Sequence, residues 1–153
     1  MHRRDDPLTP RQHRKVGADL FNHVWELLDR KNRTPEEDAK MLHAAHASCY
    51  HWGEVGTLRN VSIGEWQISR VYSVLGRAEP ALVHAQRSLE TARRAHLGRF
   101  YLAYAYEGLA RASAVAGRRR SRARYLVEAR RIGLRVRDRD DRRMLFEDLA
   151  TIP

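Results

Sequence analysis

The residues best suited to bind a metal lie between positions 43 and 51, where three histidines and a cysteine are closely spaced. His43 and His46 are about one helical turn apart, so a helix would place both on one face. Such a pair can ligate zinc when a third ligand, for example Glu65 or His84, comes from elsewhere. However, the glutamate that follows the first histidine in the zinc-peptidase helix motif is replaced here by alanine. We therefore expect His43 and His46 to pack at a seam between helices, and we predict no metal and no other cofactor.

A second group of residues follows Gly117 and consists almost entirely of arginine. The chain holds 29 basic and 19 acidic residues, and this stretch is the densest part of the basic excess. Clustered arginines can contact phosphates, so nucleic-acid binding is the alternative function for this protein. No aromatic residue is interleaved with these arginines to stack on bases, which favours a solvated helix face over a nucleic-acid site. The candidate phosphate contacts are Arg118, Arg119, Arg120, Arg122 and Arg124.

The third group combines aromatic, arginine and carboxylate side chains on two predicted helices. If these helices line a concave surface, the group forms a groove for a peptide or a small ligand. The alternative is that its aromatic residues belong to the core, where truncation of a buried ring typically costs about 3–5 kcal/mol. The candidate groove residues are Glu65, Trp66, Arg70, Tyr104 and Glu107.

Motifs of the common enzyme classes are absent from the sequence. It contains no Walker loop, no dinucleotide-binding fingerprint, no nucleophile elbow and no paired-cysteine motif. The single cysteine, Cys49, excludes an intrachain disulfide and favours a reducing cytoplasm. We therefore expect a cytoplasmic, non-enzymatic module that binds a partner protein or a peptide.

The element that positions the candidate groove is a predicted helical hairpin over residues 64–92. Apolar residues recur at three- and four-residue intervals up to Leu75, which indicates one buried helix face. Gly76 then provides the left-handed residue that commonly ends a helix. Pro80 suits the first turn of a second helix, whose stripe of small residues allows close packing against the first. The small stripe includes Ala81, Ala85, Ser88 and Ala92.

This hairpin resembles a tetratricopeptide repeat. The residues that carry the resemblance are Tyr72 at the tyrosine position, Gly76 at the turn, and Ala81 and Ser88 at the small-residue positions. The resemblance implies an all-α fold of antiparallel hairpins stacked in a right-handed superhelix, whose first helices line a concave surface that binds peptides or partner chains. It implies no catalytic residues.

The repeat is longer than the standard one of about 34 residues. Gly76 recurs as Gly117, 41 residues later (117 − 76), and the same step backwards leads to Pro35 in a turn-like stretch. It also relates Trp66 to Trp25. These correspondences predict three stacked hairpins, about the minimum for a stable array.

We expect residues 1–8 to form a flexible arm and residues 9–153 to form a single domain of about seven helices, the last one capping the stack. Thr9 and Thr34, each followed by proline, predict the starts of the first two helices, and the stretch Asp138 to Asp141 can cap the last short helix. The second helix is expected to end near Trp52, with a loop over 53–56. No run of about 18 apolar residues exists, so no membrane span is expected, and the N-terminal segment lacks the apolar core of a signal peptide. Self-association is plausible because each repeat buries its face only against a neighbour.

Overall fold

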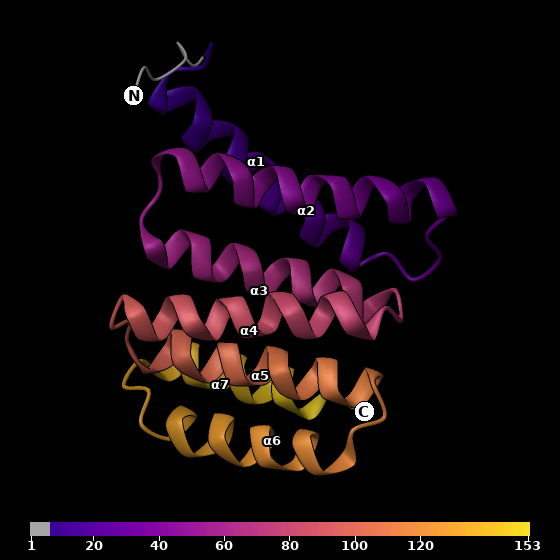
Figure 1. Ribbon diagram of the computed structural model, residues 1–153, viewed down its shortest axis with the longest axis vertical. Coiled ribbons are helices and arrows are strands. Elements are labelled where there is room, and N and C mark those ends of the chain that lie inside the picture. The colour runs from indigo at the N-terminus through magenta and orange to yellow at the C-terminus, as the bar shows by residue number, and fades with distance from the viewer. Residues whose placement is uncertain (1–6) are drawn as a thin grey trace.

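The computed structural model describes residues 7–153. Within this range the chain forms seven α-helices and no strands, which confirms the predicted all-α class (Figure 1). Most of the predicted N-terminal arm, residues 1–8, lies outside the described residues. The helices are α1 Pro10–Leu28, α2 Pro35–Val55, α3 Leu58–Val74, α4 Ala78–Arg94, α5 Arg99–Val115, α6 Arg119–Gly133 and α7 Arg139–Ala150.

The starts of three helices are fixed by the side chains that the sequence indicated. Thr9 and Thr34 each accept a hydrogen bond from the backbone N–H three residues later, and a proline follows each of them. Asp138 accepts from the backbone N–H groups of Asp140 and Asp141 at the start of α7. These bonds satisfy N–H groups that have no partner inside the helix.

Two glycines end α3 and α5 in the same way. Gly76 has φ +71° and Gly117 has φ +69°. In each turn the backbone N–H of the residue after the glycine, Arg77 or Arg118, donates a hydrogen bond to a backbone carbonyl of the preceding helix, with an N···O distance of 2.9 Å. This arrangement needs a left-handed residue, which glycine adopts without a steric cost.

The second helix is longer than predicted, because α2 continues through Gly53 to Val55. The expected loop over 53–56 is therefore wrong, since an exposed glycine inside a helix is only mildly destabilising. Gly64 also lies inside a helix, α3, where a Cβ atom would lie 2.9 Å from the Cys49 sulfur. This glycine allows α2 and α3 to approach closely.

Each helix packs against its neighbours in the chain from α1 to α6, α3 also contacts α5, and α7 contacts α5 and α6. The helices lie in successive layers, with α1 and α2 at one end and α6 at the other (Figure 1). The handedness of a superhelix stays a prediction. None of the described helices is long and apolar enough to cross a membrane.

The 41-residue period holds for the middle of the chain and not for its beginning. Helix α5 begins 41 residues after α3 (99 − 58), and α6 begins 41 residues after α4 (119 − 78). Helix α3 begins 48 residues after α1 (58 − 10), so α1 is out of this register. Pro35 is the first residue of α2, and the preceding connection spans residues 29–34.

Small residues allow the central helices to pack closely. Ala81, Ala85, Ala92 and Ala105 are fully buried between neighbouring helices. At the seam between α3 and α4, Ser62 and Ser88 each donate their hydroxyl to the other's backbone carbonyl, at 3.0 and 2.9 Å. The core therefore tolerates these two hydroxyl groups because each finds a partner across the seam.

Candidate functional site

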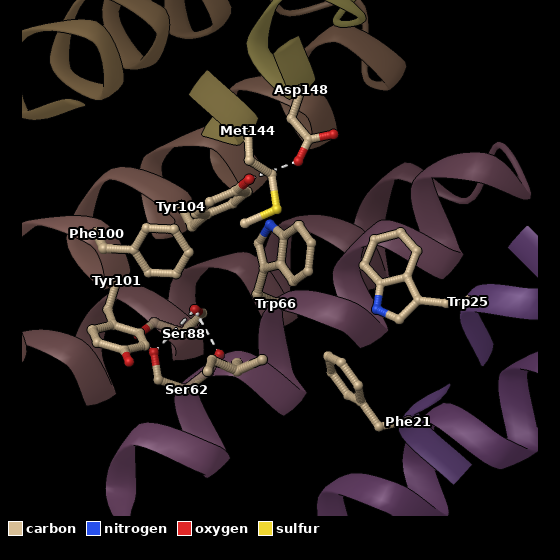
Figure 2. A pocket seen from close by; sticks show the side chains of 11 residues that line it. Phe21, Trp25, Ser62, Trp66, Ser88, Phe100, Tyr101, Tyr104, Met144 and Asp148 are labelled. Atoms are coloured by element: carbon tan, nitrogen blue, oxygen red, sulfur yellow. Dashed lines mark hydrogen bonds between the residues drawn. The ribbon is translucent and has the colours of Figure 1, made fainter. Parts of the chain in front are cut away.

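The candidate site is a pocket of about 430 Å³ on the face shared by α1, α3, α5 and α7 (Figure 2). The odd-numbered helices supply all but one of its lining residues, and Ser88 of α4 supplies the other. The lining residues are Phe21, Trp25, Ser62, Ile63, Trp66, Ser88, Phe100, Tyr101, Tyr104, Met144 and Asp148.

Six of these residues are aromatic, and their rings form a continuous wall. Figure 2 shows the two rings of α1 on one side of Trp66 and the three rings of α5 on the other. Neighbouring ring centroids lie between 4.9 and 6.4 Å apart along the whole series. Contacts at these separations are favourable beyond the area that they bury. In order, the wall comprises Phe21, Trp25, Trp66, Tyr104, Phe100 and Tyr101.

A buried carboxylate, that of Glu107, accepts a hydrogen bond from Trp66, the central ring of this wall. Glu107 has no solvent-exposed surface. Its Oε2 accepts a hydrogen bond from Nε1 of Trp66 at 2.7 Å, and its Oε1 accepts from Arg70 at 3.2 Å and from Arg111 at 2.8 Å. Burial lowers the pKa of the Arg70 guanidinium, and the charge of Glu107 opposes that shift. Because bonds to a charged acceptor are the stronger kind, this network fixes the orientation of the indole.

Asp148 of α7 closes one edge of the pocket. Its Oδ2 accepts a hydrogen bond from the hydroxyl of Tyr104 at 2.7 Å, drawn as a dashed line in Figure 2. Burial, together with this hydrogen bond, raises the pKa of Tyr104 well above its ordinary value. Arg111 donates to the backbone carbonyl of Asp148 at 3.0 Å and to the hydroxyl of Thr151 at 2.8 Å. These bonds tie α7 to α5 and so place Asp148 at the pocket.

The structure brings together four of the five predicted groove residues and separates the fifth. Trp66 and Tyr104 line the pocket. Arg70 and Glu107 lie behind the wall, where they orient the lining rather than face an occupant. Glu65 projects to another side of α3 and accepts a hydrogen bond from His84 Nδ1 at 2.6 Å.

The predicted histidine pair does not converge on a metal site. His43 is exposed, so the expectation that it packs at a helix seam is wrong, whereas His46 pairs with the hydroxyl of Tyr72 at 3.0 Å. The His46 ring also contacts the His84 ring, with centroids 5.3 Å apart. Over residues 7–153, no group of three or more histidine, cysteine, aspartate or glutamate side chains is arranged to hold a metal ion. His46 thus lies at a helix seam, among polar side chains that already pair with each other.

The predicted phosphate contacts lie at the start of α6, away from the pocket lining. Arg118, Arg119 and Arg120 are exposed. Arg122 donates to the backbone carbonyl of Pro153, and the Arg124 guanidinium lies over the Tyr125 ring, 5.1 Å from its centroid. Four of the five arginines are therefore exposed, Arg124 among them, and two, Arg122 and Arg124, contact other residues of the protein.

Sequence reasoning missed the two ends of the pocket. Phe21 and Trp25 come from α1, and Met144 and Asp148 come from α7. One signal for α1 was present in the sequence, since Trp25 lies 41 residues before Trp66 (66 − 25), and the two indoles are in contact at 5.7 Å. No comparable signal indicated that α7 would turn back against α5.

Comparisons of the chain with protein-family models, with curated proteins and with solved structures found no match. The pocket and the charges around it are therefore the observations on which a functional assignment rests.

Proposed function

We propose that this protein is a non-enzymatic binding module, a tetratricopeptide-like helical repeat that holds a peptide segment of a partner protein in the aromatic pocket. The observation that carries the proposal is the wall of six rings on the face of the odd-numbered helices. First helices of such repeats supply the binding surface in the family that the sequence resembles. The cytoplasmic location and self-association stay predictions from the sequence.

The size and chemistry of the pocket support this proposal. Ligand pockets typically enclose roughly 300–1,000 Å³ and are mostly apolar, with a few polar groups that give orientation. The volume of about 430 Å³ falls in this range. Aromatic side chains dominate the hot spots of protein interfaces, because they offer large contact areas.

The rigidity of the wall also favours binding. Trp66 and Tyr104 both have hydrogen-bonded polar tips, on Glu107 and Asp148 respectively. A surface that is already ordered loses little conformational entropy when a ligand binds. The raised pKa of Tyr104 keeps its hydroxyl protonated at neutral pH, which suits a positioning role rather than proton transfer.

The test is a selection of peptides displayed on phage against the purified protein, followed by affinity measurement on two variants. Met144 lines the pocket and is 46% exposed, so Met144→Lys should place a charge at the pocket without unfolding the protein. Val127 is 61% exposed on α6 and is not a lining residue, which makes Val127→Lys the matched control.

The selected peptides should bind wild type and Val127→Lys equally and should lose at least about tenfold in affinity for Met144→Lys, as expected for an apolar anchor displaced from its pocket. Equal affinity for all three proteins would show that the peptides bind elsewhere, and the proposal would be wrong.

Nucleic-acid binding is the second candidate, and one observation favours it. Arg118, Arg119 and Arg120 are exposed and form no ion pair with a carboxylate among residues 7–153. Fluorescence anisotropy with single- and double-stranded nucleic acid tests this candidate. It requires binding that persists at physiological salt and falls when the three arginines are changed to glutamine. Binding that vanishes as the salt concentration rises would assign the arginines to a solvated face.

A further inference from the structure

The charge of the pocket lining is opposite to that of the protein. The chain carries a formal net charge of +10. Among the residues that line the pocket, the only charged side chain is Asp148, and the others are aromatic, aliphatic or hydroxyl-bearing. An occupant therefore meets one carboxylate as the only charged group among the lining residues, in a partly buried site where electrostatic interactions are stronger than in water.

One oxygen of this carboxylate accepts no hydrogen bond from the described residues. Oδ2 is engaged by the hydroxyl of Tyr104 at 2.7 Å. Oδ1 has a single described polar neighbour, Nη2 of Arg70 at 3.9 Å, which is beyond hydrogen-bonding distance. The Asp148 side chain is 26% exposed, so it is neither fully solvated nor sealed in the core.

The positive charges near Asp148 lie behind the wall. Arg70 donates to Glu107 and is not a lining residue, and Arg111 donates to Glu107 and to backbone and hydroxyl oxygens near the end of α7. Their two charges are balanced by Glu107 and Asp148 within the same network. Arg70 weakens the field of Asp148 but offers no cation to the pocket itself.

The aromatic wall favours the same kind of occupant. The face of an aromatic ring carries partial negative charge and attracts cations within about 6 Å of the ring centroid. A cationic side chain with an apolar stem can place its methylene groups on the rings and its charged end at a carboxylate. The six rings and Asp148 supply both parts of such a site.

We propose that the pocket binds an alkylammonium group, supplied by a lysine side chain of the partner peptide, whose stem packs on the aromatic wall and whose ammonium donates to Oδ1 of Asp148. This inference rests on the proposed function, since it names the group that the pocket holds.

The experiment compares three small probes that share one apolar body and differ in charge. They are cyclohexylmethylammonium, cyclohexylmethanol and cyclohexanecarboxylate, titrated at neutral pH while the NMR signals of the tryptophan indole N–H groups are followed. The ammonium should bind at least about tenfold more tightly than the alcohol, because a hydrogen bond to a charged group is stronger than a neutral one. The carboxylate should bind most weakly.

Two variants of α7 separate the carboxylate from general electrostatics. Asp148→Asn retains an oxygen that can accept a hydrogen bond from the Tyr104 hydroxyl. In this variant the affinity for the ammonium probe should fall to within about twofold of the affinity for the alcohol probe. Glu147→Gln makes the same charge change at a neighbouring residue whose side chain is 71% exposed, and it should preserve the tenfold preference. Tyr101→Leu, which removes one ring, should weaken binding of the ammonium probe more than binding of the alcohol probe.

The source of the ammonium is tested with two peptides, acetyl-Leu-Ala-Lys-Ala-Leu-amide and its counterpart with norleucine in place of lysine. The lysine peptide should bind more tightly to wild type, and the difference should disappear in Asp148→Asn. If the small ammonium binds but the two peptides do not differ, the peptide source is wrong and the ligand is a free amine.

Equal binding of the ammonium and the alcohol to wild type would overturn the inference, while pocket binding itself would stand. Failure of all three probes to shift the Trp25 signal would also overturn it. The phage-selected peptides test the proposed function separately, because their anchor need not be cationic.

Discussion

The indole N–H of Trp66 donates a hydrogen bond to Glu107 at 2.7 Å, and the two residues are 41 positions apart, at the repeat interval that relates α3 to α5. Residues at equivalent positions of α3 and α5 thus contact each other directly. One of them contributes a ring to the pocket, and the other contributes the buried anion that orients it. The wall of the pocket is therefore coupled to the packing of the repeat.

Glu107→Gln should be strongly destabilising. Arg70 and Arg111 are largely buried, with side chains 15% and 10% exposed, and the substitution removes the anion that both contact. Leaving buried charges without their partner typically costs about 3–5 kcal/mol. We expect a loss of that size in the free energy of unfolding, measured by urea denaturation. Glu147→Gln on the exposed face of α7 is the control and should change the free energy of unfolding by no more than about 0.5 kcal/mol. Similar small losses for both variants would show that the network contributes little to stability.

Two glycines in different backbone conformations, Gly76 after α3 and Gly53 inside α2, predict opposite effects of substitution by alanine. At Gly76, φ is +71° and a Cβ atom would have no neighbour within 4 Å, so Gly76→Ala introduces backbone strain alone. It should lower the free energy of unfolding by about 1 kcal/mol. Gly53, inside α2, also has open space around a Cβ atom, and its φ lies outside the left-handed region. Gly53→Ala should raise the free energy of unfolding by about 0.5–1 kcal/mol, and a loss of stability there would contradict the assignment of Gly53 to the helix.

His46 should make the protein less stable in mild acid. Burial lowers the pKa of His46, the neighbouring His84 lowers it further, and Glu65 opposes the shift. The unfolded chain therefore binds this proton more readily than the folded protein, so the contribution of His46 is complete above pH of about 6.5 and is lost as the pH falls below that value.

The measurement compares urea unfolding of wild type and His46→Gln at pH 7.5 and 5.5, since glutamine can still bond to the Tyr72 hydroxyl. Wild type should lose more stability than the variant between these two pH values. An equal loss in both proteins would assign the acid sensitivity to other histidines.

Several helix boundaries were readable from the sequence because a local interaction decides them, but the start of α3, where Thr57 and Asn60 form a capping box, was not. Thr9, Thr34 and Asp138 cap their helices with bonds to residues two or three positions away, and Gly76 and Gly117 adopt the left-handed conformation that their type favours. The end of α2 was not readable, because Gly53 is compatible with both a loop and an exposed helix position.

The candidate site was readable only in part, because it depends on helix rotation and on contacts between distant segments. Trp66 and Glu65 are adjacent in the sequence, yet one faces the pocket and the other faces His84. The periodicity of α3 does not separate these two directions, since many of its residues are buried on more than one side. Asp148 reaches the pocket through bonds from Tyr104 and Arg111, which connect α5 to a helix beyond the repeats.

The most direct test of the central claim, that the aromatic pocket is the binding site, uses the three tryptophan indole signals in NMR spectra of the protein titrated with a phage-selected peptide. Trp25 and Trp66 line the pocket, whereas Trp52 lies outside it on α2. We predict that the indole signals of Trp25 and Trp66 shift in a saturable way while that of Trp52 stays in place. Unchanged Trp25 and Trp66 signals, with shifts confined to residues at the start of α6, would contradict the claim.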